Sequence, residues 1–329
     1  MDPMLETAEL LRQHRKFVLT THISSDGDGV GSQLALARTL RSLGAEVKII
    51  NPTRVPYNLK FLFKYPNEIT TPGNRNNAIN HFAGALTIVV DMGAFNRLGP
   101  ILGYAEKSEG LLVIDHHRME RQPGVHYFID EKACATGEIV ARIVEELGVP
   151  FSAEIAEPLY VAIHTDTGGF RYPGTTGDTH RLLARLLDSG GVDPQEIYTS
   201  LYERLSLRRI HLTAEILATM EISKGGKVAW MVMKDSMLKK LNARIEDAED
   251  MVNYTMKLDG VVAGFFFKEL ITGKTKVSCR SRGDFAVDDF VKPLGGGGHM
   301  HAAGVRLDEG LDEVVELIIS KALAQLEGD

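Results

Sequence analysis

Short apolar runs alternate with helical patterns along the first half of the chain. The runs have the length of buried strands and cover residues 17–19, 46–50, 85–90 and 110–114. Apolar residues recur at helical spacing in four segments, which cover residues 33–43, 136–147, 153–164 and 177–189. Strands that alternate with helices are typical of a parallel sheet, so the pattern predicts an α/β fold.

The second half of the chain shows the same alternation after a long helical segment. Residues 194–220 are expected to form one long helix that connects two domains. Beyond it we expect strands at 227–233, 261–267 and 274–281, and helices at 248–258 and 311–326. Residues 51–80, rich in Pro, Asn and Thr, are expected to be irregular. The predicted organisation is a first domain at 1–192, a helical linker at 193–223 and a smaller α/β domain at 224–329.

Acidic and imidazole side chains follow three of the expected strands and end one expected helix. They are His22, Asp26, Asp28, Asp91, Asp115, His116, His117 and Asp166. In open parallel sheets, ligands bind outside the carboxyl ends of the strands, so these residues are expected to converge. A single Asp or His at such a place is usually a cap or turn residue. Four clusters at four termini argue instead for one shared site.

Nitrogen and oxygen donors without a thiolate make up the best candidates for metal ligands. These candidates are His22, Asp26, Asp28, Asp91, His116 and Asp166. Such a set suits manganese, magnesium or another first-row divalent ion and argues against a structural zinc site. Six side chains can hold two metals if one carboxylate bridges them. Asp91, alone at the end of its strand, is the candidate bridge.

Two metal ions in this arrangement would clamp an in-line displacement at phosphorus. His117, next to a candidate ligand, could orient the substrate or protonate the leaving oxygen. Asp115 is expected to support a metal-bound imidazole, because such imidazoles usually donate to a carboxylate. His117, Asp91 and Asp115 are therefore the predicted catalytic residues.

The composition of the chain limits the classes of binding partner and the cellular setting that can be expected. The 329-residue chain has a net charge of −7, which argues against binding of long nucleic acid and leaves a small anionic substrate. Its apolar stretches are far shorter than a membrane span, so no membrane partner is expected. With only two cysteines, a disulfide framework is not expected, and a reducing, cytoplasmic setting is predicted.

Taken together, these motifs resemble those of the DHH phosphoesterase superfamily. The matching segments of the first domain are His22 to Ser32, Asp91, Asp115-His116-His117 and Asp166-Thr167-Gly168. The segments Ser278 to Ser281 and Gly295 to His299 resemble the DHHA1 substrate domain. The resemblance implies two manganese ions that share Asp91. It assigns His22 and Asp26 to one ion, and Asp28, His116 and Asp166 to the other.

The second domain is expected to bind the substrate. Lys276, Ser278 and Arg280 share one face of a strand, where Arg280 can offer a planar fork to a phosphate. The glycine run can present backbone amides, or it can act as a flexible hinge. The predicted substrate-binding residues are Ser278, Arg280, Ser281, Gly296, Gly297, Gly298 and His299. If this domain grips a terminal phosphate, the distance to the metals limits substrate length.

Within the superfamily, the chain is most similar to the nanoRNases and pAp phosphatases. That similarity implies hydrolysis of very short RNA oligonucleotides to mononucleotides, and of 3′-phosphoadenosine 5′-phosphate (pAp) to AMP. A phosphodiesterase for cyclic dinucleotides such as c-di-AMP, or for their linear products, is the alternative for the same site. A catalytically silent nucleotide sensor is the alternative outside catalysis, although none of the six metal positions is substituted. Relatives often form homodimers.

Overall fold

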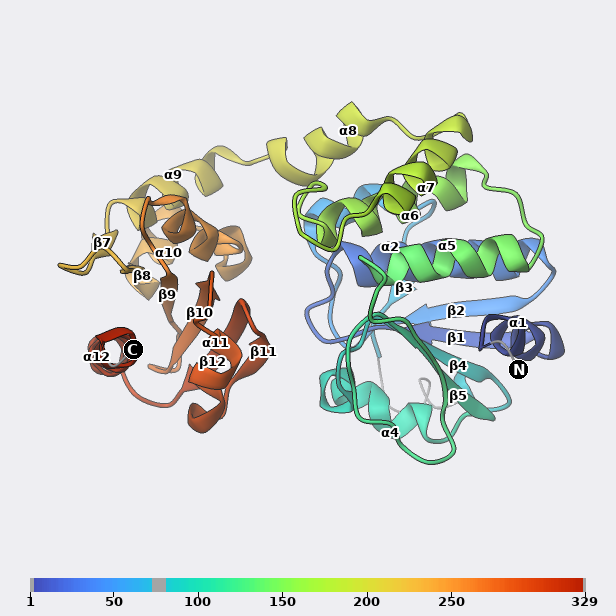
Figure 1. The fold of residues 1–329 in the computed structure, drawn as a ribbon, viewed down its shortest axis with the longest axis horizontal. Coiled ribbons are helices and arrows are strands. Elements are labelled where there is room, and N and C mark those ends of the chain that lie inside the picture. Colours follow the sequence, from blue (N-terminus) through green and yellow to red (C-terminus); the bar gives the residue numbers. More distant parts are fainter. Residues whose placement is uncertain (1–2, 73–80, 328–329) are drawn as a thin grey trace. The chain divides into compact units, whose positions relative to one another are not determined.

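The computed structural model describes residues 3–72 and 81–327, except for the side chains of His299 and Glu327. The chain forms two compact units, Met1–Arg204 and Leu205–Asp329 (Figure 1). The division falls inside the expected linker at 193–223. Each unit has its own sheet and its own core, so the α/β organisation in two domains is confirmed.

The sheet of the first unit is entirely parallel. Its strands are β1 (Lys16–Thr20), β2 (Glu46–Ile50), β3 (Ile69–Thr70), β4 (Leu86–Val90), β5 (Gly110–Asp115) and β6 (His126–Ile129). They lie in the order β3-β2-β1-β4-β5-β6, with parallel pairing throughout. In such a doubly wound sheet the strand order reverses between β1 and β4, and a crevice opens there at the carboxyl ends of the strands.

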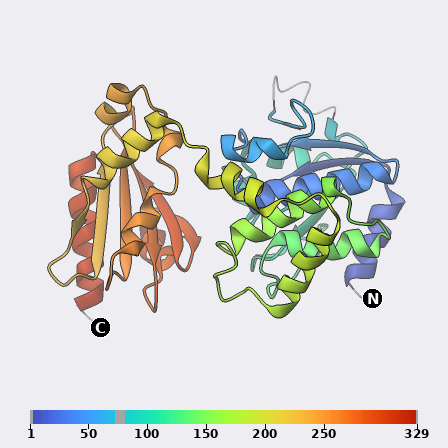
Figure 2. The ribbon, with the colours of Figure 1, turned by 90° about the horizontal axis from the view of Figure 1, so that it is seen from above.

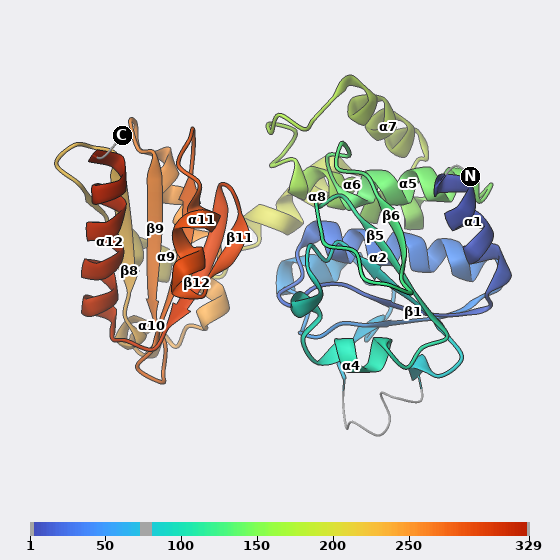
Figure 3. The ribbon, with the colours of Figure 1, turned by 60° about the horizontal axis from the view of Figure 1, so that its bottom comes forward.

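Helices cover both faces of this sheet. The helical segments are α1 (Pro3–Gln13), α2 (Gly27–Ser42), η1 (Tyr57–Leu62), η2 (Phe95–Ile101), α4 (Leu102–Ala105), α5 (Thr136–Glu146), α6 (Ala153–Asp166) and α7 (Gly177–Asp188). Helices α2, α5 and α6 lie on one side of the sheet and α4 lies on the other (Figure 3). The larger apolar core lies beneath α2, α5 and α6, because their buried faces meet the apolar strands.

Helix α2 begins earlier than the sequence predicts, since its first turns contain the glycines of the motif. A Cβ at Gly31 would lie 2.3 Å from the backbone oxygen of Pro158 in α6, and a Cβ at Gly27 would lie 2.3 Å from Thr165 Oγ1. Glycine lowers helix propensity, so the sequence pattern places the start six residues later, at residue 33. These two glycines allow α2 to pack closely against α6.

The connection between the two units is helical but is not the single long helix that the sequence predicts. It consists of α8 (Pro194–Tyr198), the π-helical turn η3 (Thr199–Glu203) and α9 (Leu207–Leu217). Ser206 has an extended backbone, and its side chain accepts a hydrogen bond from the Arg209 N–H. This N-cap starts a new helix, so the long helix is interrupted before α9.

The second unit contains a mixed sheet. Its strands are β7 (Glu221–Ile222), β8 (Val228–Met233), β9 (Ala263–Glu269), β10 (Thr275–Ser281), β11 (Gly297–His299) and β12 (Ala302–Leu307). The order is β11-β12-β10-β9-β8-β7, and all pairs are antiparallel except β8 with β9. The three strands predicted from sequence are confirmed, whereas β7, β11 and β12 were not predicted.

Helical segments pack on both faces of the second sheet. They are α10 (Asp235–Leu241), η4 (Ile245–Ala248), η5 (Met251–Lys257), α11 (Val287–Val291), η6 (Lys292–Leu294) and α12 (Leu311–Glu327). Helices α11 and α12 cover one face, and α12 is the red helix along the sheet in Figure 2. On the opposite face, α9, α10, η4 and η5 cover β8 and β9, while alternate side chains of β10 and β12 stay partly or fully exposed.

Some segments differ from the sequence-based expectation. Residues 51–72 contain η1 and β3, so this stretch is not wholly irregular, and residues 73–80 lie outside the described part. The helix expected at 248–258 is the 3-10 segment η5. Within the described ranges, no helix combines the length and apolar character that crossing a membrane requires.

Candidate active site

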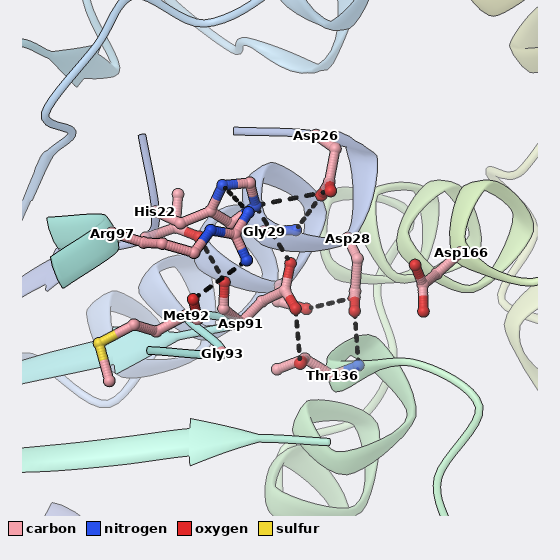
Figure 4. Close-up of polar contacts among 12 residues, drawn as sticks. His22, Asp26, Asp28, Gly29, Asp91, Met92, Gly93, Arg97, Thr136 and Asp166 are labelled. Atoms are coloured by element: carbon pink, nitrogen blue, oxygen red, sulfur yellow. Dashed lines mark hydrogen bonds and ion pairs between the residues drawn. The ribbon is translucent and has the colours of Figure 1, made fainter. Parts of the chain in front are cut away.

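Three of the predicted ligands of the first unit follow the carboxyl ends of neighbouring strands, whereas Asp26 and Asp28 lie at the start of α2 and Asp166 ends α6. His22 follows β1, Asp91 follows β4, and His116 follows β5. Because β1 pairs with β4 and β4 pairs with β5, these side chains meet at one edge of the sheet. The predicted convergence is therefore observed. Figure 4 shows it for His22, Asp26, Asp28 and Asp91.

The first group of candidate ligands surrounds His22. Its Nε2 lies 3.5 Å from Asp26 Oδ2 and 3.6 Å from Asp91 Oδ2. Donor atoms of these three residues lie close enough together to hold one metal ion. Asp26 is also the N-cap of α2, where its Oδ1 accepts a hydrogen bond from the Gly29 N–H at 3.1 Å.

The second group surrounds His116. Its Nε2 lies 3.3 Å from Asp166 Oδ2, 3.8 Å from Asp28 Oδ2 and 3.8 Å from Asp91 Oδ1. Asp28, His116 and Asp166 form another set with metal-binding spacing. Asp91 points one oxygen at each group, Oδ2 toward His22 and Oδ1 toward His116. Its carboxylate thus lies where a ligand that bridges two ions would lie.

Asp91 is held in an unusual backbone conformation. Its φ is +51°, a value that non-glycine residues rarely adopt and that Asp and Asn tolerate best. Thr136 Oγ1 donates to Asp91 Oδ1 at 3.4 Å, and Thr21 Oγ1 donates to the Asp91 carbonyl at 3.3 Å. Backbone strain at a site of this kind is characteristic of functional positions.

Backbone N–H groups hold the buried carboxylate of Asp28. The N–H groups of Thr136 and Gly137, at the start of α5, donate to it at 2.6 and 2.8 Å. Ser32 Oγ adds a third hydrogen bond at 3.1 Å. A Cβ at Gly137 would lie 2.6 Å from Ala162 Cβ, so glycine lets α5 approach α6 closely at this position.

Negative charge is concentrated in this site. Burial, followed by the neighbouring carboxylate of Asp91, raises the pKa of Asp28 above its usual range and raises that of Asp166 to about 8. Burial alone would lower the pKa of His22, but the carboxylates of Asp26 and Asp91 outweigh it and raise the value to about 10. Such a cluster is stabilised by positive charge, which divalent cations would supply.

The two imidazoles have the orientation that metal ligands need. The Nδ1–H groups of His22 and His116 can donate to the carbonyls of Ile23 at 2.7 Å and Ala133 at 3.3 Å. This arrangement directs Nε2 of each ring toward the carboxylates. His116 Nε2 is buried and has no hydrogen-bond partner among the described residues. Burial and the neighbouring His117 lower the pKa of His116, which favours the neutral form that binds metal.

Asp115 and His117 lie beside these groups, and Asp91, His116 and His117 form a third set with metal-binding spacing, in which His117 Nδ1 is 3.4 Å from Asp91 Oδ1. Asp115 Oδ1 lies 2.7 Å from His117 Nδ1, and Oδ2 accepts hydrogen bonds from the Met92 and Gly93 N–H groups at 2.7 and 2.8 Å. Burial lowers the pKa of His117, but the hydrogen bond to Asp115 and other carboxylates outweigh it, so the value is raised. Asp115 supports His117 rather than His116, the imidazole that was predicted as a ligand, and both imidazoles belong to groups with metal-binding spacing.

Arg97 also lies at this site, although the sequence pattern did not single it out. Its Nη2 is 2.8 Å from His22 Nδ1, and Nη1 donates to the Met92 carbonyl at 3.2 Å. A Cβ at Gly93 would lie 3.1 Å from Nη1, so glycine leaves room for the guanidinium. Among the described residues, no carboxylate lies within ion-pair distance of Arg97. Its position in a 3-10 turn gives no periodic signal.

The predicted substrate-binding residues of the second unit separate into two groups. Ser278 and Arg280 lie on the partly exposed face of β10, where Arg280 donates to Asn253 Oδ1 at 3.2 Å. Ser281 is buried on the other face, 3.0 Å from His301 Nδ1. The structure therefore does not bring Ser281 together with Ser278 and Arg280.

The glycine run has a structural role as well. A Cβ at Gly298 would lie 2.4 Å from the Ala302 oxygen, and a Cβ at Gly296 would lie 2.7 Å from the Gly304 oxygen. Both glycines are therefore required by close packing within the unit. Gly297 has open space around its Cβ position. His299 ends β11, and its side chain lies outside the described part of the structure.

Comparison with known proteins agrees with this arrangement of motifs. A model of the DHH family, N-terminal domain, matches residues 16–163, and a model of the DHHA1 domain matches residues 216–327. A bifunctional oligoribonuclease and PAP phosphatase NrnA of Thermus thermophilus is 32% identical over 89% of this chain and 84% of its own length. The chain belongs to the DHH family. The Bacillus subtilis protein of the same name is 27% identical to this DHH protein, over 88% of each chain.

Solved structures share the fold. An exopolyphosphatase-related protein from Bacteroides fragilis superposes on this DHH protein with a TM-score of 0.91 at 26% identity, and the match covers 98% of this chain and 96% of the other. RecJ from Thermus thermophilus, solved in complex with Mn2+, superposes with a TM-score of 0.59 at 15% identity. That match covers all of this chain and 55% of RecJ, and it shows a common fold.

Proposed function

We propose that this DHH protein is a two-metal phosphoesterase that acts on very short nucleotides. It hydrolyses short RNA oligonucleotides to mononucleotides and pAp to AMP. The observation that carries the proposal is the pair of ligand groups, His22-Asp26-Asp91 and Asp28-His116-Asp166, with one Asp91 oxygen directed at each. The names of the Thermus and Bacillus relatives supply the substrate class.

The residues present fit two divalent cations, for which Mn2+ is the first choice and Mg2+ or Co2+ the alternatives. The donor set consists of carboxylate oxygens and imidazole nitrogens, which these ions prefer. Nε2 of His116 gives further support, because it is buried and has no hydrogen-bond partner in the described part of the chain. When bound, two such ions offset charge on the phosphoryl oxygens and lower the pKa of a water molecule.

Side chains of the protein would carry out the remaining steps. Asp115 holds His117 through its Nδ1, which fixes the orientation of the ring beside Asp91. A ring held in this way, with a raised pKa, is suited to give a proton to the leaving oxygen. Arg97 faces the same site with guanidinium N–H groups, which can donate to a phosphoryl oxygen.

The second unit would select the substrate. We assign metal binding to residues 1–192 and substrate binding to residues 224–329, with 193–223 as the linker. Arg280 has no carboxylate within ion-pair distance among the described residues, and Ser278 lies on the same face of β10. A terminal phosphate is the ligand that this pair suits. Gly297 and the backbone around it leave space for the attached nucleoside.

A product time course with Mn2+ tests the proposal. The panel contains 5′-phosphorylated diadenylate, pAp, cyclic di-AMP, a longer RNA and pyrophosphate, and Asp91→Asn is the inactive control. We expect fast conversion of diadenylate and pAp, and slow conversion of the longer RNA. A preference for cyclic di-AMP would reassign the same site to cyclic dinucleotide turnover. If no substrate is converted, the protein would instead be interpreted as a catalytically silent nucleotide sensor.

A further inference from the structure

Three positively charged residues lie side by side across the second sheet. In the register of the antiparallel strands, Lys276 of β10 faces Lys268 of β9 on one side and Arg306 of β12 on the other. Directly opposed residues have Cβ atoms only about 5 Å apart. All three side chains belong to the face that also carries Ser278 and Arg280. We call Lys268, Lys276 and Arg306 the basic row.

No carboxylate of the described residues lies within ion-pair distance of the basic row, and the Lys268 ammonium lies 5.2 Å from the centre of the Phe266 ring. Among the described residues, none of its three members forms an ion pair or a hydrogen bond through its side chain. Glu249 and Asp250 act on Lys268 only at longer range. Lys268 is 6% exposed, and burial, followed by the charge of Lys276, lowers its pKa to about 8. Like charges directly opposite one another destabilise a sheet, so a bound anion would reduce the repulsion among these three side chains.

The basic row is continuous with the expected phosphate contact at Arg280. Ser278 lies two residues from Lys276 along β10, a distance of roughly 7 Å in a strand. Ser278 faces Gly304 of β12, which has no side chain to block the path. Lys276 and Arg306 are exposed, whereas Lys268 lies at the edge of the part that the helical segments cover. Arg280 lies four residues from Lys276, roughly 13 Å along the strand, so a ligand with phosphates two nucleotides apart could contact Arg280 and the basic row together.

We propose that the basic row is a second phosphate subsite, in which Lys276 and Arg306 contact one more phosphate of an oligonucleotide whose other phosphate lies at Arg280. Lys268 adds positive charge from below. The inference rests on the proposed function, because it concerns the same class of substrate. It predicts that affinity rises with the number of phosphates, and that the added affinity depends on the basic row.

Equilibrium binding by the full-length protein in EDTA tests this subsite without cleavage. The probes are AMP, inorganic phosphate, 5′-phosphorylated diadenylate and 5′-phosphorylated triadenylate. We expect Lys276→Ala to weaken triadenylate binding about tenfold and AMP binding less than about twofold, since one charge-assisted contact is lost. The slope of log affinity against log salt should fall by about 0.7 for triadenylate. Arg280→Ala should weaken all the nucleotides.

Lys274→Ala is the matched control. Lys274 precedes β10 and pairs with Asp308 at 2.6 Å, so its removal costs the unit the same charge outside the basic row. The subsite would be overturned if Lys274→Ala and Lys276→Ala reduced triadenylate affinity equally. It would also be overturned if Lys276→Ala reduced the affinities for AMP and triadenylate equally, or if the unaltered protein did not bind triadenylate. Binding of inorganic phosphate without binding of the nucleotides would make the basic row an isolated anion site, and this result would also overturn the proposed subsite. Failure of the proposed function would appear separately, as an absence of hydrolysis with Mn2+.

Discussion

Like charges are concentrated in both units, but they are held in different ways. In the first unit, backbone N–H groups donate to the clustered carboxylates, as those of Thr136 and Gly137 do to Asp28. In the second unit, strand register alone sets Lys268 beside Lys276 and Arg306, and no hydrogen bond fixes their side chains among the described residues. Both arrangements cost free energy that a ligand of opposite charge can recover.

The difference concerns preorganisation. Carboxylates held by the backbone keep their geometry before a cation arrives, as metal chemistry requires. Long cationic side chains that form no ion pair with the described residues can adapt to phosphates at different positions, at the cost of lost rotamer freedom on binding. We therefore expect substitutions in the acidic cluster to abolish function, and substitutions in the basic row to change affinity by smaller factors.

Asp91→Asn is expected to have the largest effect. Asn tolerates the positive φ of residue 91 and can still accept from Thr136, so the substitution removes charge while the backbone is preserved. Loss of the shared carboxylate should reduce metal affinity at both groups and lower activity by on the order of 10³-fold. Titration calorimetry with Mn2+ would measure the first effect independently of turnover.

Asp178→Asn is the control for that experiment, because Asp178 is an exposed residue of α7 that pairs with Arg181 outside the site. It should leave both metal binding and activity within about twofold. Full metal occupancy in Asp91→Asn would contradict the bridging role of Asp91. It would also show that metal binding depends less on each single carboxylate than the comparison of the two units implies.

Arg97→Met is expected to have the next largest effect. If His22 Nδ1–H donates to Ile23, the Arg97 Nη2 that lies 2.8 Å away needs another acceptor, and a phosphoryl oxygen can supply it. Loss of this contact should lower kcat/KM by about 10- to 100-fold. Mn2+ affinity should stay within about threefold, since Arg97 is not a candidate ligand.

A steady-state analysis of Arg97→Met, beside the exposed Arg181→Met, separates the explanations. Parallel loss of metal affinity and activity would mean that Arg97 acts by positioning His22. Loss of activity without loss of metal affinity would mean that Arg97 contacts the substrate. The acidic site of the first unit would then also contain a cationic side chain that binds phosphate, as the second unit is proposed to do.

The acidic cluster could be predicted from the sequence because its members lie in local segments at strand ends. His22, Asp91 and His116 each follow an apolar run, and the order of a parallel sheet brings such ends together. Arg97 lies in a 3-10 segment that contains Gly99 with a φ of +50° and Pro100, so no periodic pattern marks it. Local sequence therefore predicts which candidate ligands come together, but not the side chains that enter the site from irregular turns.

The basic row could not be predicted, because it depends on long-range pairing. Lys276 was recognised as sharing a face with Ser278 and Arg280, since alternation along one strand is a local rule. Arg306 joins it only through the register of β10 with β12, and β12 was not predicted as a strand. The start of α2 was predicted too late for a related reason, since Gly27 and Gly31 approach α6, which lies far along the chain.

Lys268→Met tests whether the basic row costs stability in the absence of a ligand. Because burial and Lys276 lower the pKa of Lys268 from 10.5 to about 8, the protonated amine is less stable in the folded than in the unfolded state. At pH 7 the variant should be more stable by about 1–3 kcal/mol. Between pH 8 and 10.5 the folded protein releases this proton while the unfolded chain keeps it, so the unaltered protein gains stability and the difference shrinks.

Denaturant unfolding across this pH range, with the exposed Lys224→Met as control, would measure the effect. Lys224→Met should change the unfolding free energy by less than about 0.5 kcal/mol at every pH. Added triadenylate should stabilise the unaltered protein more than Lys268→Met, because it binds the folded state whose charge it neutralises. If Lys268→Met is instead less stable at pH 7, the carboxylates of Glu249 and Asp250 already neutralise the amine. The charges of the basic row would then be stabilised by the protein itself, as those of the acidic cluster are.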